Sequence, residues 1–385
     1  MTDLPHRIDT QLIHAGEPRP RIEGAVSLPI FQSSTFEYGG QGQYDDLRYI
    51  RLNNTPNHVA LGRKLAVLEG AEAALVTGSG MAAISAVLLT LLSPGDHLIA
   101  QNGLYGGTHA FIAEDLSAMG IGVDWTAADD PAELSALIRP TTRLVYVETM
   151  TNPLIEVADL PGIAAFCRDH GLVSVIDNTF ATPVNFRPVG HGFDLSIHSA
   201  TKYLNGHSDI VAGAVIGKSE MVSRITRTLN HLGGTLDPHA CFLLHRGLKT
   251  LAVRIRHQNA SALAIARFLA DHPEVEAVHY PGLPEHPSHA WARSLLAGFG
   301  GMLSFRLRGD VDRADRFIRN TTLPLCAPSL GGVETLITRP ATTSHSGMSA
   351  TDRRAVGIDD ELIRLSVGLE ATEDLIADFR RAVDG

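Results

Sequence analysis

The apolar positions of the chain gather into short runs between about residues 58 and 245, and helical stretches lie between these runs. Short apolar runs separated by helices are typical of the strands of a mainly parallel sheet that is covered on both faces. The sequence therefore predicts an α/β fold. The expected strands are AALVT (73–77), HLIA (97–100), LVYVE (144–148), VSVID (173–177), LSIHS (195–199) and VAGAVI (211–216).

The segments on either side have different patterns. The N-terminal part is rich in Gly, Pro, Asn and Gln and shows little periodicity, which predicts an extended arm that contacts a neighbouring subunit. Residues 239–270 have apolar positions at helical spacing and predict one long helix leading to a second domain. The segments 300–307 and 361–370 indicate a smaller α+β unit. We expect three parts: an arm at 1–57, a main domain at 58–245 and a C-terminal domain at 246–385.

Composition narrows the class of protein. The chain has 385 residues, 44% of them apolar, and a formal net charge of −10 without a long basic block, so nucleic acid is not an expected partner. The N-terminus is polar and no stretch approaches the ~18 apolar residues of a membrane span, so we expect a cytoplasmic protein that does not bind membranes. Three scattered cysteines favour reduced thiols over disulfides or a zinc site.

Polar residues follow three of the predicted strands. Glu148–Pro153, Asp177–Thr179 and Ser199–Lys202 each begin where an apolar run ends. Ligands of open parallel sheets bind at the carboxyl ends of the strands, so these residues are expected to meet in one crevice. An acid, a lysine and small hydroxyl groups suit a phosphorylated cationic ring that bears a carbonyl, and pyridoxal 5′-phosphate (PLP) is such a ligand.

A glycine-rich turn, Thr77–Ala83, comes directly after another predicted strand and opens an apolar helix. Its backbone N–H groups and the helix N-terminus are suited to binding a phosphate. The same residues match the dinucleotide fingerprint G-x-G-x-x-A, so a nicotinamide-dependent dehydrogenase is an alternative from another class. That alternative needs an acid at the end of the next strand, where the sequence has Gln101-Asn102-Gly103.

The 18 histidines raise the question of a metal site. Those between residues 191 and 245 have no H-x-x-x-H spacing, and the cysteines form no C-x-x-C pair. We therefore expect no metal.

Five segments spread along almost the whole chain together form a specific pattern: LIHAG (12–16), VIDNTFATP (175–183), DLSIHSATKY (194–203), GHSDIVAGAV (206–215) and LIRLSVGLEATEDLIADF (362–379). Through them the chain resembles the Cys/Met-metabolism family of PLP enzymes, which includes cystathionine γ-synthase, cystathionine γ- and β-lyases, O-acylhomoserine sulfhydrylases and methionine γ-lyase. The resemblance implies a type I PLP-dependent transferase fold, a PLP-binding domain at 58–245, and a homotetramer built as a dimer of dimers with shared active sites.

The resemblance also implies which residues hold the cofactor. Lys202 would form a Schiff base with PLP and, once displaced by substrate, take the Cα proton. Asp177 would contact the ring nitrogen, and Tyr105 would stack on the ring and relay a proton to the leaving group. The phosphate would be held by Ser199, Thr201 and the backbone of Gly80 and Met81.

Further residues are implied for the partner subunit and the substrate. Tyr49 and Arg51 occupy the place of a family Tyr-x-Arg that reaches the phosphate of the adjacent subunit, although YIRLNNTPN (49–57) departs from the commoner form of this motif. Arg364 would bind the substrate α-carboxylate, assisted by Asn152 and Ser329.

The substrate pocket gives mixed indications. Thr338 stands where γ-acting cystathionine enzymes usually have Glu, and Gly107 stands where methionine γ-lyases have Cys. We predict a trans-sulfuration enzyme that cleaves or forms the C–S bond of cystathionine or a related sulfur amino acid, with γ-elimination or γ-replacement favoured. Alternatives are a cystathionine β-lyase, an O-acylhomoserine sulfhydrylase, or a PLP-binding protein without catalytic activity.

Overall fold

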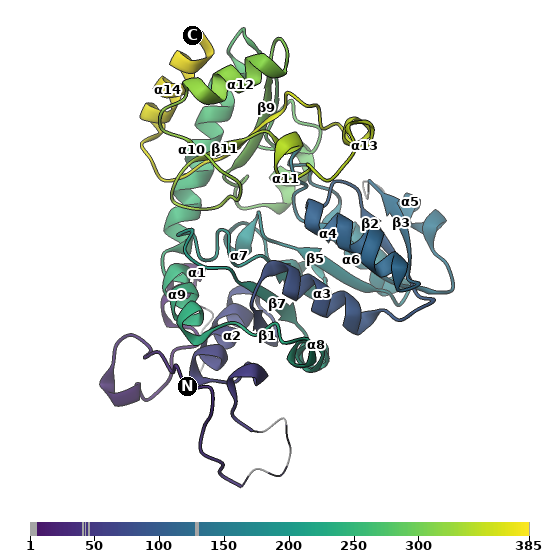
Figure 1. Cartoon of the computed structure of the whole chain (residues 1–385), viewed down its shortest axis with the longest axis vertical. Coiled ribbons are helices and arrows are strands. Elements are labelled where there is room, and N and C mark those ends of the chain that lie inside the picture. Colours follow the sequence, from purple (N-terminus) through teal and green to yellow (C-terminus); the bar gives the residue numbers. More distant parts are fainter. Residues whose placement is uncertain (1–5, 41, 43, 45–46, 128–130, 385) are drawn as a thin grey trace.

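A computed structural model describes residues 6–40, 42, 44, 47–127 and 131–384. Within these residues the chain forms two sheets (Figure 1). The larger sheet has seven strands in the order β1-β7-β6-β5-β4-β2-β3. Its strands are β1 (Ala73–Thr77), β2 (His97–Gln101), β3 (Gly122–Thr126), β4 (Thr142–Glu148), β5 (Val173–Asp177), β6 (Leu195–His198) and β7 (Gly213–Gly217).

The centre of this sheet is parallel, as the buried apolar runs predict. Strands β3, β2, β4, β5 and β6 run parallel, and only β7 pairs antiparallel with both of its neighbours, β6 and β1. The register places Glu148 directly opposite Asp177, at the carboxyl ends of β4 and β5. The polar residues that follow these two strands are therefore brought side by side.

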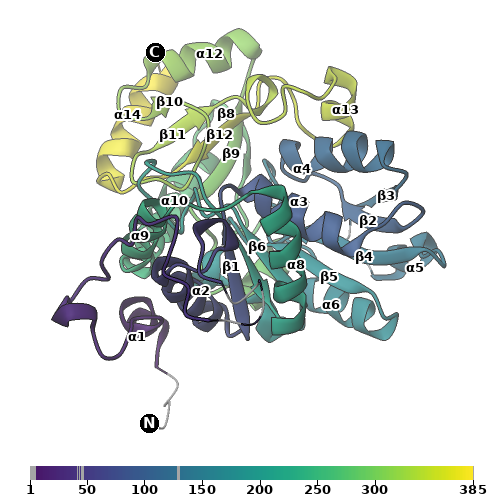
Figure 2. The same ribbon diagram turned by 60° about the horizontal axis from the view of Figure 1, so that its bottom comes forward.

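Helices cover both faces of the larger sheet. Alternate residues of β4 point to opposite faces, so Leu144 and Tyr146 belong to the apolar cluster that includes α3 and α8, and Val145 and Val147 belong to the cluster that includes α2 and α6. In both Figure 1 and Figure 2, α3 and α8 lie next to each other on one face. The helices of this part are α2 (Pro56–Glu69), α3 (Gly80–Leu91), α4 (Gly106–Ala110), α5 (Pro131–Leu137), α6 (Leu160–Asp169), α7 (Thr182–Asn185), α8 (Ser219–Leu232) and α9 (Pro238–Leu248), with the turns η4 (Phe111–Leu116) and η5 (Pro188–His191).

The second sheet has five strands in the order β10-β11-β12-β9-β8 within the described residues, and it lies at the C-terminal end of the molecule (Figure 1). Helices α10, α12 and α14 cover it with a separate apolar core. The fold is thus an α/β domain with a smaller α+β domain, as predicted. Its elements are α10 (Leu251–Ala270), β8 (Val275–His279), α11 (His289–Leu295), β9 (Met302–Leu307), α12 (Val311–Asn320), β10 (Leu325–Cys326), β11 (Leu336–Thr338), η6 (Pro340–Thr342), α13 (Ala350–Ala355), β12 (Ile363–Ser366) and α14 (Thr372–Asp384).

The prediction of one long helix over 239–270 was wrong, because α9 ends at Leu248 and α10 begins at Leu251. The backbone of Asn205 approaches Gly247 so closely that a Cβ there would lie 2.3 Å from the Asn205 carbonyl oxygen. The Gly247 carbonyl at the end of α9 accepts hydrogen bonds from Thr250 and Arg254. Tertiary contacts therefore interrupt the helical pattern.

The N-terminal arm is mostly extended but contains α1 (Ile8–His14), η1 (Ile22–Gly24) and η3 (Ile50–Leu52). Helix α1 packs against α2 and α10, where the buried Lys64 amine donates to the Leu12 carbonyl at 2.7 Å. A domain boundary at residue 245 falls inside α9. The division into 1–57, 58–245 and 246–385 stays a prediction.

No described helix is both long enough and apolar enough to cross a membrane.

Candidate active site

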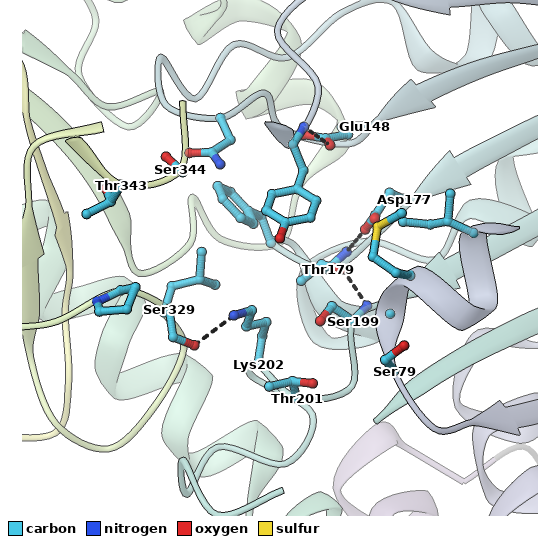
Figure 3. Close-up of a pocket in the computed structure, with 18 of the residues that line it drawn as sticks. Ser79, Glu148, Asp177, Thr179, Ser199, Thr201, Lys202, Ser329, Thr343 and Ser344 are labelled. Carbon is cyan, nitrogen blue, oxygen red and sulfur yellow. Dashed lines mark hydrogen bonds between the residues drawn. The ribbon is translucent and has the colours of Figure 1, made fainter. Parts of the chain in front are cut away.

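A cavity of about 680 Å³ opens at the carboxyl ends of β4, β5 and β6, where the α/β domain meets the C-terminal domain (Figure 3). This is the edge at which parallel sheets bind ligands. Its lining contains the polar residues that follow three strands. The lining residues are Ser79, Gly80, Met81, Ile84, Tyr105, Glu148, Met150, Asn152, Asp177, Thr179, Phe180, Ser199, Thr201, Lys202, Val211, Pro328, Ser329, Leu330, Thr342, Thr343, Ser344 and Arg364.

Lys202 follows β6 and directs its amine into the cavity (Figure 3). Its Nζ donates to Ser329 Oγ at 2.7 Å, a contact that joins the two domains. Burial, together with the positive charge of Arg364, lowers the pKa of Lys202 to about 8. A larger share of this amine is therefore neutral near neutral pH than for an exposed lysine, and a neutral amine can attack an aldehyde.

Asp177 ends β5 on the side of the cavity away from Ser329 (Figure 3). Its Oδ1 accepts the backbone N–H of Thr179 at 2.9 Å, and Thr179 Oγ1 accepts the backbone N–H of Ser199 at 2.8 Å. Burial raises the pKa of Asp177. A cationic ring nitrogen next to this carboxyl would favour its ionised form.

The N-terminus of α3 forms another wall of the cavity. Ser79 Oγ accepts the backbone N–H of Ala82 at 3.0 Å and so caps the helix. A Cβ at position 80 would lie 2.9 Å from the Ser199 Cβ, so only glycine fits between the helix and the Ser199–Lys202 turn. Because the first N–H groups of a helix have no partner within it, this wall is suited to a phosphate.

Tyr105 precedes α4 and is 45% exposed at the mouth of the cavity. Its backbone N–H donates to Glu148 Oε1 at 2.7 Å (Figure 3). The Glu148 carboxyl group therefore holds the backbone of Tyr105, and the phenol ring faces the cavity.

Arg364 enters from β12 of the C-terminal domain and is almost completely buried. Its Nη1 donates to Asn152 Oδ1 at 3.2 Å, and its Nη2 donates to the Ser329 carbonyl at 3.1 Å. The guanidinium group faces the cavity near the Lys202 amine. A carboxylate bound there would lie close to that amine.

These residues fit PLP. A buried amine with a lowered pKa, a buried carboxyl and a helix N-terminus match the aldehyde, ring nitrogen and phosphate of this cofactor.

Comparison with known proteins decides the family. The family of Cys/Met metabolism PLP-dependent enzymes matches residues 9–384. The chain belongs to this family. It is a PLP-dependent enzyme, and the glycine-rich turn after β1 is part of a PLP fold, so the dehydrogenase alternative is set aside.

The relatives of this family member act on sulfur amino acids. Cystathionine β-lyase of Lactococcus lactis subsp. cremoris is 42% identical over 98% of this chain and 99% of its own. Cystathionine γ-lyase of Bacillus subtilis is 41% identical over 97% of this chain and 98% of its own. A crystal structure of cystathionine γ-synthase from Xanthomonas oryzae pv. oryzae, in complex with aminoacrylate and cysteine, superimposes with a TM-score of 0.95, at 38% identity over 99% of this chain and 98% of that one.

The fold brings most of the predicted site residues of this PLP enzyme into one cavity. They are Lys202, Asp177, Ser199, Thr201, Gly80, Met81, Tyr105, Asn152, Ser329 and Arg364.

Three predicted residues lie elsewhere. Thr338 is buried in β11, opposite Arg364 in the register, and does not line the cavity. Tyr49 and Arg51 lie in the arm, where Arg51 donates to the Asn230 carbonyl at 2.8 Å and to the Tyr44 hydroxyl at 2.6 Å. Their predicted role concerns an adjacent subunit.

Other lining residues had no role assigned from the sequence. Glu148 ends one predicted strand and Thr179 lies just after another. Their place at the carboxyl ends of strands could therefore have marked them as candidates. Thr342 ends the short helix η6 of the C-terminal domain, Thr343 and Ser344 follow it, and no local pattern marked these residues.

Proposed function

We propose that this enzyme breaks or forms the C–S bond at the γ-carbon of cystathionine or a related sulfur amino acid. The observation that carries the proposal is that Ser329 contacts both Lys202 and Arg364. A substrate whose carboxylate binds Arg364 then has its Cα next to the Lys202 amine. β-Elimination and sulfhydrylation of O-acylhomoserine use the same first steps and are the competing outcomes of the test below.

The lining of the cavity supports roles in holding the cofactor. Lys202 would hold PLP covalently, Asp177 would bind its ring nitrogen, and Tyr105 would pack against its ring. The hydroxyl groups of Ser199 and Thr201 and the first N–H groups of α3, at Gly80 and Met81, would bind the phosphate. When bound, PLP withdraws electrons from the substrate Cα, so that its proton can leave.

The substrate end of the cavity selects for an amino acid. Arg364 binds the α-carboxylate as a fixed, planar pair of donors, and Asn152 and Ser329 hold the guanidinium in place. Once free, the Lys202 amine would take the Cα proton, pass it on, and then take a second proton from Cβ, so that the bond between Cγ and sulfur can break. The Tyr105 hydroxyl donates a proton to the departing sulfur.

The same region supports cystathionine over methionine as the substrate. Methionine γ-lyases have cysteine where this chain has Gly107. A Cβ at position 107 would lie 2.6 Å from the Tyr105 ring, so a cysteine there would displace that ring. Thr342, Thr343 and Ser344 surround the mouth of the cavity with hydroxyl groups, which suit a polar distal group.

We also propose that the enzyme is a homotetramer in which Tyr49 and Arg51 reach the phosphate site of a neighbouring subunit. The exposed apolar side chains of the arm support this, because Val26 is 84% exposed and Tyr38 is 65% exposed in the single chain.

A substrate panel tests the function. Cystathionine, cysteine, methionine, and O-acylhomoserine with cysteine would each be incubated with the PLP-loaded enzyme, and the products would be identified by mass spectrometry. γ-Elimination of cystathionine yields cysteine, ammonia and 2-oxobutanoate, whereas β-elimination yields homocysteine, ammonia and pyruvate. Pyruvate as the main keto acid from cystathionine would contradict γ-chemistry, whereas cystathionine formed from O-acylhomoserine and cysteine would show γ-replacement. No product from any substrate would indicate a protein without catalytic activity.

A further inference from the structure

Glu148 lies in the wall of the cavity but has no part in the roles assigned above. It ends β4, is only 4% exposed, and its Oε1 accepts the backbone N–H of Tyr105 at 2.7 Å. Its own backbone N–H donates to the side chain of Gln101 at 2.8 Å. Strand β4 therefore fixes the position of Glu148. Glu148 in turn holds the backbone of Tyr105, the residue directly before α4.

The residue opposite Glu148 in the register is Asp177, so two carboxyl groups share one buried region. Within the described part of the chain neither acid forms an ion pair. The nearby cations, Lys202 and Arg364, bind Ser329 and Asn152 instead. Two adjacent buried carboxylates repel each other, so one of them is expected to keep its proton.

The hydrogen bonds and the cofactor decide which acid that is. Asp177 accepts the backbone N–H of Thr179 and faces the site of the ring nitrogen, and both favour its anion. Burial and the neighbouring charge of Asp177 raise the pKa of Glu148 well above its usual 4.5. A protonated Glu148 still accepts the Tyr105 N–H through its carbonyl oxygen.

We propose that Glu148 is a positioning residue that stays protonated beside the ionised Asp177 and anchors Tyr105 at the mouth of the site through its main chain. The inference rests on the proposed function, because that function assigns Asp177 and Tyr105 to the cofactor. If Glu148 is neutral, the negative charge of the two acids lies on Asp177, next to the site of the ring nitrogen.

The ionisable groups around Glu148 come from several elements. Asp177 faces it from β5, and Tyr146 lies two residues earlier on β4, where burial and the negative charge of Asp177 raise the pKa of the phenol. The Tyr105 phenol lies at the start of α4, and Lys202 and Arg364 lie across the cavity. Asp177 is thus the one group that the strand register places directly opposite Glu148.

Two substitutions separate the charge of Glu148 from its hydrogen bond. Glu148→Gln keeps the acceptor oxygen but never ionises, whereas Glu148→Ala removes both features. We expect Glu148→Ala to raise the PLP dissociation constant about tenfold, and Glu148→Gln to raise it less than about threefold, because one buried hydrogen bond corresponds to roughly that factor. Absorbance titration of the apoprotein with PLP measures both. Equal losses in the two variants would show that a carboxylate is required and would overturn the proposal.

The pH dependence of unfolding gives a second measurement that a merely structural role would not change. Because the folded-state pKa of Glu148 is raised, its contribution to stability is fully present below its unfolded pKa and is lost as the pH rises through the folded value. Glu148→Gln lacks this loss, so the melting temperature of the PLP-loaded variant minus that of wild type should increase with pH from about 5 to about 9. The matched substitution of the exposed Glu373, Glu373→Gln, should show a constant difference.

A pH-independent difference for Glu148→Gln would overturn the role of Glu148 alone. Failure of the wild-type protein to bind PLP would overturn the proposed function and the inference together. The two failures are therefore distinguishable.

Discussion

The side chain of Lys202 reaches Ser329 across the domain boundary, with 2.7 Å between Nζ and Oγ. Ser329 adopts a left-handed backbone conformation, with φ at 87°, and its carbonyl accepts a hydrogen bond from Arg364. One residue of the C-terminal domain thus contacts both the Lys202 amine, the proposed Schiff-base group, and the Arg364 guanidinium, the proposed carboxylate-binding group. Under the proposed roles, the packing of the two domains fixes how the amine and the guanidinium lie relative to each other.

Replacing the Lys202 amine should abolish covalent binding of PLP. In Lys202→Ala, borohydride reduction and intact-mass measurement should detect no pyridoxyl adduct, and turnover should fall by about 10²–10⁴-fold through loss of the general base. Lys218→Ala is the matched control, because Lys218 is an exposed lysine paired with Asp194. An adduct in Lys202→Ala would place the attachment at another lysine.

The rate of PLP attachment to the apoprotein should follow the pKa of Lys202, which is lowered to about 8. Below this pH the amine is mostly protonated, and only the neutral form attacks, so the observed rate should rise about tenfold per pH unit from about pH 6 and level off above about pH 8. Stopped-flow absorbance after mixing with PLP measures it. A rate that keeps rising to about pH 10 would mean that the amine has the pKa of an ordinary exposed lysine.

Removing the charge of Asp177 should weaken catalysis more than cofactor binding. In Asp177→Asn, the ring nitrogen loses its anionic partner, so turnover should fall at least about 10²-fold while the covalent adduct at Lys202 still forms. Steady-state kinetics together with intact mass after reduction separate the two effects. Asp169→Asn on the exposed end of α6 serves as the control, and turnover within twofold of wild type in Asp177→Asn would exclude the assigned role.

Binding of the substrate carboxylate should depend on the two parallel N–H donors of the Arg364 guanidinium. Arg364→Lys keeps a positive charge but loses the bidentate geometry, so KM should rise by about 10- to 100-fold with little change in PLP affinity. Kinetics with the best substrate of the panel and a PLP titration test this, with the exposed Arg308→Lys as a control. An unchanged KM would place the carboxylate elsewhere.

Arg254 should stabilise the turn that carries Lys202. It is 3% exposed, and its guanidinium donates to the carbonyls of Tyr203 and Gly247 at 2.8 and 3.0 Å. Arg254→Met leaves these buried acceptors without partners, which should lower the free energy of unfolding by about 2–4 kcal/mol. Urea denaturation measures the loss. The neighbouring Arg256 pairs with Asp9 on the surface, so Arg256→Met should cost less than about 1 kcal/mol.

The sequence was sufficient to predict six of the seven strands of the larger sheet, as the described residues form it, and the residues that follow them. The predicted run at 173–177 coincides with β5, because a buried parallel strand needs several apolar residues in succession. The run at 73–77 coincides with β1, which pairs antiparallel with β7. It missed β3, where Gly122–Thr126 is only partly buried and mixes polar with apolar residues. A strand can therefore be predicted from the sequence when its apolar residues follow one another directly.

The tertiary structure alone decided how distant segments meet. Strand register put Glu148 opposite Asp177, and packing of the two domains brought Arg364 next to Lys202. Thr338, expected at the substrate, lies buried in β11 and is not part of the cavity lining. The interruption of the helix near Gly247 has the same origin, because the contact with Asn205 comes from a remote part of the chain. The sequence by itself thus determined the chemistry that is available, through local patterns and motifs. The distances at which that chemistry operates come from packing between segments far apart in the chain, which no local pattern specifies.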